Sequence, residues 1–157
     1  MANSPKRSTP TWHDLAQPSI GKQARWGRGL ERTRWASCGK EWDAVAITPM
    51  KRGLNVLTAL RIGPRRGALV LADHLRDTLY VMVEPGTGDV LAGLPGVRVL
   101  SGGSELLMPT TYGDTTAAAD LISHPRIGEP PALIPTDRLA QALRDLPADA
   151  PEEAPVS

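Results

Sequence analysis

The chain has very little cysteine, and that scarcity excludes several kinds of site. Its single thiol, Cys38, cannot form an internal disulfide or supply a zinc site built from several thiolates. No histidine is close to Cys38 in sequence to act as a base, so we interpret it as a structural thiol rather than a nucleophile.

Long apolar runs are also missing. None approaches the roughly 18 residues of a membrane-spanning helix, and the start of the chain is too polar for a signal peptide. We therefore expect a cytoplasmic protein without a membrane span.

Recognisable catalytic and cofactor motifs are absent as well. His13, His74 and His124 are scattered, without the short regular spacing of metal ligands. The glycine-rich pieces 86–88 and 101–104 fit neither common phosphate-binding pattern, and we interpret both as turns. We predict no catalytic residues, no metal ligands and no cofactor.

Charge, in contrast, is present and unevenly distributed. Residues 1–40 carry a formal charge of +6, whereas residues 41–157 carry −5. The two parts therefore face different partners, or each other.

The two ends of the chain are poor in apolar residues. Residues 1–10 are mainly serine, proline, lysine and arginine, and residues 147–157 are proline, alanine and acid. Such segments cannot offset the entropy cost of ordering, about 1 to 2 kcal/mol per residue. We expect a basic disordered tail over 1–19, a single α+β domain over 20–146 and an acidic disordered tail over 147–157.

Three stretches have the spacing of helices. Residues 20–36 predict a marginal helix, because Gly27 and Gly29 disfavour its interior. Residues 50–60 predict a helix of about three turns, and Thr136 is the expected N-cap of a helix over 137–146.

Short apolar runs between turn residues predict the strands. They lie at 42–48, 68–72, 79–83, 97–100 and 105–108, with a short edge strand at 121–122. The segment 101–104 has the length of a hairpin connection between its two neighbouring strands. The fold class is therefore α+β, with a small mixed or antiparallel sheet, flanking helices and disordered termini.

Four segments of the chain occur in an order that is typical of one group of proteins. They are Cys38-Gly39-Lys40-Glu41-Trp42-Asp43-Ala44-Val45, Gly67-Ala68-Leu69-Val70-Leu71-Ala72-Asp73, Leu79-Tyr80-Val81-Met82-Val83-Glu84-Pro85-Gly86-Thr87, and Pro95 to Gly103 with the strand ending at Pro109. In this order the chain resembles a group of small actinobacterial proteins that are similar to the N-terminal domain of bifunctional DNA primase/polymerases. The resemblance covers roughly residues 36–109 and implies a shared sheet.

The catalytic activity of that family depends on residues that must also be present in this chain. The resemblance implies nucleotidyl transfer by two metal ions, which needs closely spaced carboxylates such as an Asp-x-Asp or Asp-x-Glu pair on a strand. The chain contains neither pair, so the resemblance is to a degenerate member. Asp43, Asp73 and Asp77 are the nearest candidates, but Asp73 and Asp77 also suit the start and end of a turn.

Aromatic and basic residues alternate near the N-terminus. Trp12, Trp26 and Trp35 lie among arginines, a combination that stacks on bases and binds phosphates. The alternative is that the tryptophans dock this region on the domain; Trp42 is expected in the core. The predicted binding residues for nucleic acid or a protein partner are Arg25, Trp26, Arg28, Arg32, Arg34 and Trp35.

Three functions follow, in decreasing order of support. The first is a non-enzymatic accessory or regulatory protein that acts through protein contacts. The second is a module that binds DNA or RNA through the basic Trp/Arg segment. The third is a residual metal-dependent nucleotidyl transferase that uses Asp73 or Asp43. The sequence leaves the partner and the oligomeric state open.

Overall fold

The computed structural model describes residues 10–29 and 32–146. Within them the chain has an α+β fold with four α-helices, one 3₁₀ helix and seven strands in two sheets. The helices are α1 (Trp12–Ala16), α2 (Ile20–Arg28), α3 (Met50–Ala59) and α4 (Thr136–Asp145), and the 3₁₀ helix is η1 (Gly88–Leu91). The strands are β1 (Thr33–Ser37), β2 (Asp43–Ile47), β3 (Val70–Asp73), β4 (Thr78–Val83), β5 (Val97–Leu100), β6 (Glu105–Pro109) and β7 (Asp120–Ser123).

The larger sheet has five strands in the order β5-β2-β4-β3-β7, and every neighbouring pair is antiparallel. Its central strands β2, β4 and β3 are buried along their whole length. A strand covered on both faces needs apolar residues at nearly every position, which explains the continuous apolar runs in the sequence.

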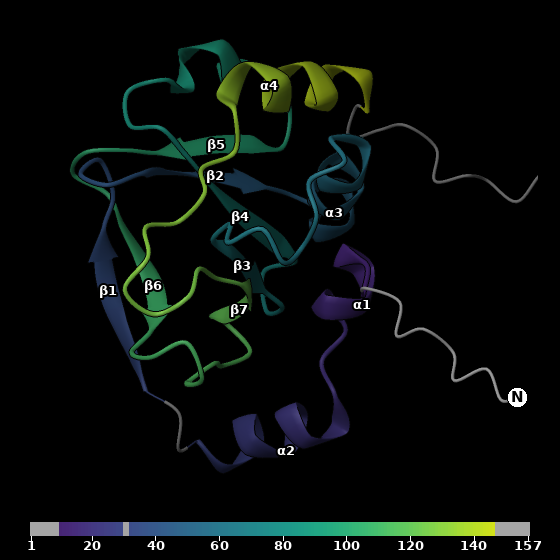
Figure 1. Ribbon diagram of the computed structural model, residues 1–157, viewed down its shortest axis with the longest axis vertical. Coiled ribbons are helices and arrows are strands. Elements are labelled where there is room, and N and C mark those ends of the chain that lie inside the picture. Colours follow the sequence, from purple (N-terminus) through teal and green to yellow (C-terminus); the bar gives the residue numbers. More distant parts are fainter. Residues whose placement is uncertain (1–9, 30–31, 147–157) are drawn as a thin grey trace, which may run out of the picture.

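Each face of this sheet has its own cover (Figure 1). On one face, alternate residues such as Val45 and Val81 pack with Trp12 of α1, Leu57 of α3 and Leu139 of α4. The other face lies under a two-stranded ribbon formed by β1 and β6. The chain is therefore layered as helices, sheet and ribbon.

The start of the ordered domain differs from the sequence prediction. Residues 10–19 were expected in a disordered tail, but Thr11 and Asp14 form a capping box at the start of α1. Trp12 is 2% exposed and its Nε1 donates to the carbonyl oxygen of Ile62 at 2.7 Å. The domain thus begins earlier than predicted; residues 1–9 and 147–157 of the predicted tails lie outside the described residues.

The predicted helix over 20–36 is wrong in its second half. Ser19 caps α2, and Gly29 ends it with the left-handed φ of 66° that glycine adopts without strain. Residues 33–37 form β1 instead, pairing with β6 from Thr33 opposite Pro109 to Ser37 opposite Glu105. Pairing with a distant strand overrides local helical spacing here.

Two further predictions need correction. The strands β5 and β6 do not form a hairpin, because β5 pairs with β2 whereas β6 pairs with β1. The segment 101–104 therefore carries the chain from the sheet to the ribbon. Thr136 is the first residue of α4 rather than its N-cap, and its hydroxyl lies 2.6 Å from that of Thr87.

A buried arginine ties the helical layer together. Arg52 of α3 is 5% exposed, and its guanidinium donates to the carbonyl oxygens of Leu143, Leu146 and Pro95. Two of these carbonyls are at the C-terminal end of α4, where a cation also complements the helix dipole. Among the described residues no helix is long and apolar enough to cross a membrane.

Candidate functional site

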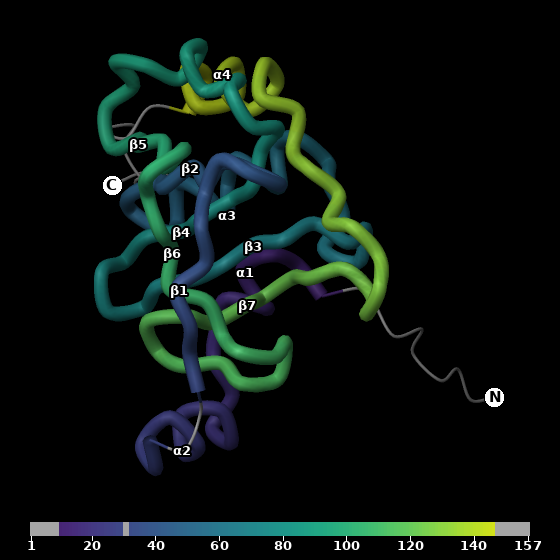
Figure 2. Tube along the Cα trace, turned by 90° about the vertical axis from the view of Figure 1, so that its left-hand side faces the viewer, coloured from purple at the N-terminus to yellow at the C-terminus, as the bar shows by residue number. Residues whose placement is uncertain are grey.

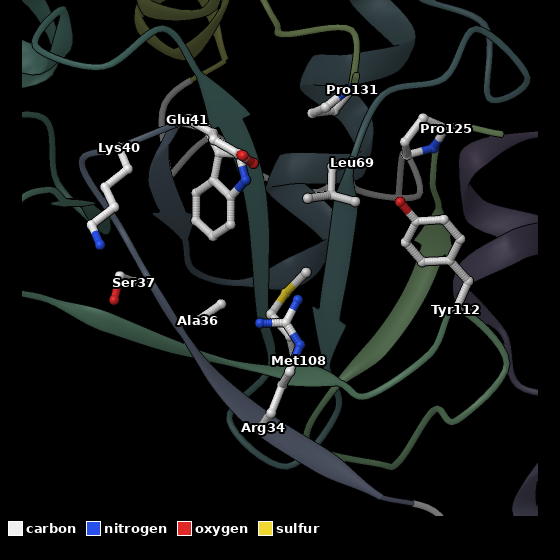
Figure 3. Close-up of a pocket in the computed structure, with 11 residues that line it drawn as sticks. Arg34, Ala36, Ser37, Lys40, Glu41, Leu69, Met108, Tyr112, Pro125 and Pro131 are labelled. Carbon is white, nitrogen blue, oxygen red and sulfur yellow. The ribbon is translucent and has the colours of Figure 1, made fainter. Parts of the chain in front are cut away.

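A groove opens between the ribbon and the loops that lead into β2 and β3 and follow β6 and β7 (Figure 3). Its volume is about 280 Å³. The ribbon contributes Arg34 and Met108, which face each other across the β1–β6 ladder. The remaining lining residues are Ala36, Ser37, Lys40, Glu41, Trp42, Leu69, Tyr112, Pro125 and Pro131.

One wall of the groove is apolar and aromatic. Trp42 is buried, as expected of a core residue, and still contributes to the wall. Tyr112 stacks on the ring of His124, with centroids 4.3 Å apart and an interplanar angle of 20°. In Figure 3 Pro125 lies above Tyr112, and Pro131 lies above Leu69. Such a wall offers a preformed surface for an apolar or aromatic group.

Cations border the groove on the side of β1. Arg34 and Lys40 are exposed, and neither forms an ion pair with another described residue. Glu41 is the only acidic residue of the lining. The rim therefore favours an anionic ligand.

A second hollow of about 530 Å³ adjoins the groove and shares Arg34, Met108 and Tyr112 with it. It also includes Ile127, whose side chain is 93% exposed. Together the two hollows form a longer depression beside β1, suited to an extended ligand rather than a compact one.

The strand β1 has an open edge next to this depression. Among the described residues β1 pairs only with β6. The N–H of Thr110 donates to the carbonyl of Arg32, and the N–H of Cys38 donates to the carbonyl of Ser104. These bonds show that the even-numbered residues of β1 direct their backbone N–H and C=O groups toward β6.

By alternation, Thr33, Trp35 and Ser37 direct their N–H and C=O groups to the open edge. The side chain of Trp35 is 65% exposed and lies opposite Leu107 on the outer face of the ribbon. The ribbon therefore offers unpaired backbone groups and an exposed aromatic side chain at the same position.

The six predicted binding residues separate into two groups. Arg32, Arg34 and Trp35 lie on or beside β1 and are exposed. Arg25 and Arg28 lie in the last turn of α2, also exposed. Trp26 is the exception, since it is half-buried against the domain.

Trp26 belongs to the contact that docks α2 on the sheet. Its ring lies 5.3 Å from that of His74, and its Nε1 donates to Thr115 Oγ1 at 3.4 Å. Beside it, the fully buried carboxylate of Asp120 meets Lys22 Nζ at 2.6 Å and His74 Nε2 at 2.9 Å. The basic N-terminal segment is thus joined to the acidic remainder by an ion pair, and α2 runs below the sheet to β1 (Figure 2).

The candidate catalytic carboxylates do not meet. Asp43 pairs with Val83 at one end of β4, whereas Asp73 pairs with Thr78 at the other. Five residues of strand separate these positions by roughly 17 Å. Among the described residues no group of three or more His, Cys, Asp or Glu side chains could hold a metal ion.

Asp73 and Asp77 have local roles in the β3–β4 turn. Asp73 Oδ1 accepts hydrogen bonds from the N–H groups of Leu75 and Arg76, at 3.0 and 3.1 Å. Asp77 adopts a positive φ of 51° at the end of the turn, and its Oδ1 accepts from the N–H of Met50. The carboxylate of Asp73 therefore stabilises the turn, and that of Asp77 ties the end of the turn to the start of α3.

Cys38 is buried and forms no disulfide. Burial raises the pKa of its thiol above the ordinary value of 9.0, and the nearby charge of Asp43 raises it further. A thiol that resists ionisation is a poor nucleophile at neutral pH.

Sequence reasoning missed several residues of the groove. Lys40, Tyr112 and the two prolines come from loops whose spatial proximity has no local sequence signal. The exposure of Trp35 on a strand was also not predicted, because residues 33–36 were assigned to a helix.

Comparison with protein-family models, with curated proteins and with solved structures finds no match for the chain.

Proposed function

We propose that this protein is a non-enzymatic accessory or regulatory factor that binds an extended, acidic segment of a partner protein along the open edge of β1. The observation that carries the proposal is the position of Trp35. Its backbone N–H and C=O face the open edge, and its side chain is 65% exposed on the outer face of the ribbon, while the neighbouring Arg34 lines the groove. An added strand would bond to the backbone and place alternate side chains into pockets.

The charge of the edge favours an acidic partner. Arg32, Arg34 and Lys40 lie along β1 and its continuation, with no ion pair among the described residues. A second copy of β1 would bring the same positive charges to the edge, and repulsion between like charges disfavours self-pairing. Tryptophan and arginine together are also the residues most enriched where binding energy concentrates.

A peptide selection tests this proposal directly. The immobilised protein is offered a displayed library of random linear peptides, and enriched sequences are synthesised for affinity measurement. We expect enrichment of acidic peptides with alternating apolar residues, and a loss of affinity of at least roughly tenfold in Arg34→Glu.

Arg98→Glu is the matched control, because Arg98 is an exposed arginine on the edge strand β5 of the other sheet. It should leave the affinity unchanged. Selection of no acidic peptide, or an equal loss in Arg34→Glu and Arg98→Glu, contradicts the proposal.

A second candidate, single-stranded nucleic acid, is favoured by one observation. Arg25, Arg28, Arg32 and Arg34 are all exposed between the last turn of α2 and the groove, so a phosphate backbone could follow them. A salt titration of binding to single-stranded and double-stranded DNA tests it. Absence of binding at low salt, or binding unaffected by Arg25→Gln with Arg28→Gln, removes this candidate.

A further inference from the structure

Two buried carboxylate oxygens of the described residues lack a hydrogen-bond partner, Asp43 Oδ1 and Asp120 Oδ1. Asp120 Oδ1 is paired with the ammonium of Lys22, whereas Asp43 has no ion pair within the same part of the chain. Asp43, the first residue of β2, is 1% exposed. Its Oδ2 accepts the N–H of Gly86 at 2.9 Å, whereas its Oδ1 has no partner among the described residues. Buried carboxylates normally have their oxygens paired, because an unpaired one loses hydration without compensation.

Asp43 lines a cavity of about 330 Å³ between η1 and β5. The polar side chains of the lining are Asp43, Asp89 and Ser101. Asp43 is buried and Asp89 exposed, so Asp43 is on the interior wall and Asp89 is at the rim. The other lining residues are Gly86, Gly88, Leu91, Ala92, Gly93, Val97 and Val99, and none of the lining side chains is basic.

The glycines of the lining have different roles. A Cβ at Gly88 would lie 2.8 Å from Val99 Cγ1, so this glycine lets η1 approach β5 closely. A Cβ at Gly86 or Gly93 would meet nothing within 4 Å, although both have the positive φ of 81° that favours glycine. The N–H of Gly86 binds Asp43 Oδ2, so the exposed turn at Gly86 covers this carboxylate, and the space beside its Cα is open.

This lining suits an organic cation. Two carboxylates and one hydroxyl, without any basic side chain, attract positive charge and accept hydrogen bonds. A divalent metal ion is a poorer match, since it needs six or more oxygen ligands in a polar shell, whereas Leu91, Val97 and Val99 form an apolar wall. An alkyl stem could pack on that wall while its charged end reaches the interior carboxylate.

We propose that this cavity is a binding site for a primary alkylammonium group, held by Asp43 with its stem along Leu91, Val97 and Val99. The group belongs either to a free amine or to a lysine side chain of a partner. Neither the open edge of β1 nor its arginines takes part, so this site and the proposed peptide site are tested separately.

The test is a titration monitored by the backbone amide signals of residues 86–93 and 97–101. The probes are n-butylammonium, 1,4-diaminobutane and an acetylated lysine amide, with 1-butanol as the neutral control of similar shape. At neutral pH the amines carry their charge, because their pKa values are near the 10.4 of lysine. We expect saturable shifts at these signals with at least one amine, and at least roughly tenfold weaker binding of 1-butanol.

Variants assign the binding to the cavity. Asp43→Asn should weaken amine binding at least roughly tenfold, whereas Asp73→Asn, a buried carboxylate at the far end of the sheet, should leave it unchanged. If Asp43→Asn does not fold, Ala92→Trp fills the cavity from an exposed position and should abolish the shifts.

Binding of the free amines, of the lysine amide or of both supports the site and identifies the source of the group. The proposal is overturned if no amine shifts these signals, or if 1-butanol binds as well as the amines. It is also overturned if Mg²⁺ produces the same shifts in place of an amine, or if amine binding survives Ala92→Trp.

Discussion

Trp35 lies directly opposite Leu107 in the β1–β6 ladder and keeps 65% of its surface exposed. Trp12, in contrast, is 2% exposed beneath the sheet, where it donates to Ile62. Trp26 lies between these extremes, against His74. The three tryptophans of the N-terminal region thus lie in three environments: Trp35 is exposed, Trp12 is in the core and Trp26 docks α2. Substitutions can distinguish these environments.

Trp35→Ala should leave the free energy of unfolding within about 0.5 kcal/mol of the wild type, because little surface is uncovered. Trp12→Ala should lower it by about 3 to 5 kcal/mol, the usual effect of removing a buried tryptophan. Chemical denaturation of both variants measures the difference. Equal destabilisation by the two substitutions would contradict the exposed position of Trp35.

Lys22→Gln should loosen α2. It removes the ammonium from Asp120 Oδ1 and leaves a fully buried oxygen unpaired, at a cost of about 1 to 3 kcal/mol. Hydrogen exchange of the α2 amides should accelerate. Arg25→Gln makes the same charge change at an exposed position without an ion pair among the described residues, and its α2 amides should exchange as in the wild type.

Arg52→Met should destabilise the helical layer by about 2 to 4 kcal/mol, since buried carbonyl groups lose a charged donor. Leu143 and Leu146 are among the acceptors, so α4 should lose protection from hydrogen exchange more than β3 does. Arg98→Met makes the same change at an exposed position of β5 and serves as the comparison. Uniform loss of protection through α4 and β3 would show that the arginine does not act through α4.

Cys38 should react slowly with alkylating agents in the folded protein. Because burial raises the pKa of its thiol in the folded state, the unfolded chain ionises first as pH rises. The contribution of the Cys38 thiol to the free energy of unfolding is therefore complete below the pKa of the unfolded chain, and it declines as pH rises above about 9. The prediction is checked by measuring the free energy of unfolding across this pH range in the wild type and in Cys38→Ala. Identical pH profiles of the two proteins would contradict a raised pKa of the Cys38 thiol.

The sequence predicted most of the larger sheet because its strands are short apolar runs bounded by turns. The strands predicted at 42–48, 79–83 and 97–100 each agree with a strand of the structure to within one residue at either end. The helix over 50–60 was also predicted, since its apolar residues follow a helical period and only one face is required to pack.

Residues 33–37 show why the rest could not be predicted. The local spacing of residues 33–36 favoured a helix, but β1 depends on pairing with β6 about 70 residues later in the chain. The hairpin predicted for 97–108 failed for the same reason, since β5 finds β2 and β6 finds β1. The arginines and Trp35 were selected from composition, whereas Lys40 and Tyr112 join them only through tertiary structure.

The central claim is that the open edge of β1 accepts another strand, and a proline at position 37 tests it most directly. Ser37 directs its N–H away from β6, so Ser37→Pro removes an edge donor without removing a bond of the ladder. Ser37→Ala retains that donor and is the matched control.

The measurement is the affinity of each variant for a selected peptide, together with hydrogen-exchange protection of the Trp35 amide on binding. We predict that Ser37→Ala binds as the wild type does and gains protection at Trp35, while Ser37→Pro loses affinity at least roughly tenfold. Equal affinity of the two folded variants, with no protection at Trp35, would contradict the account.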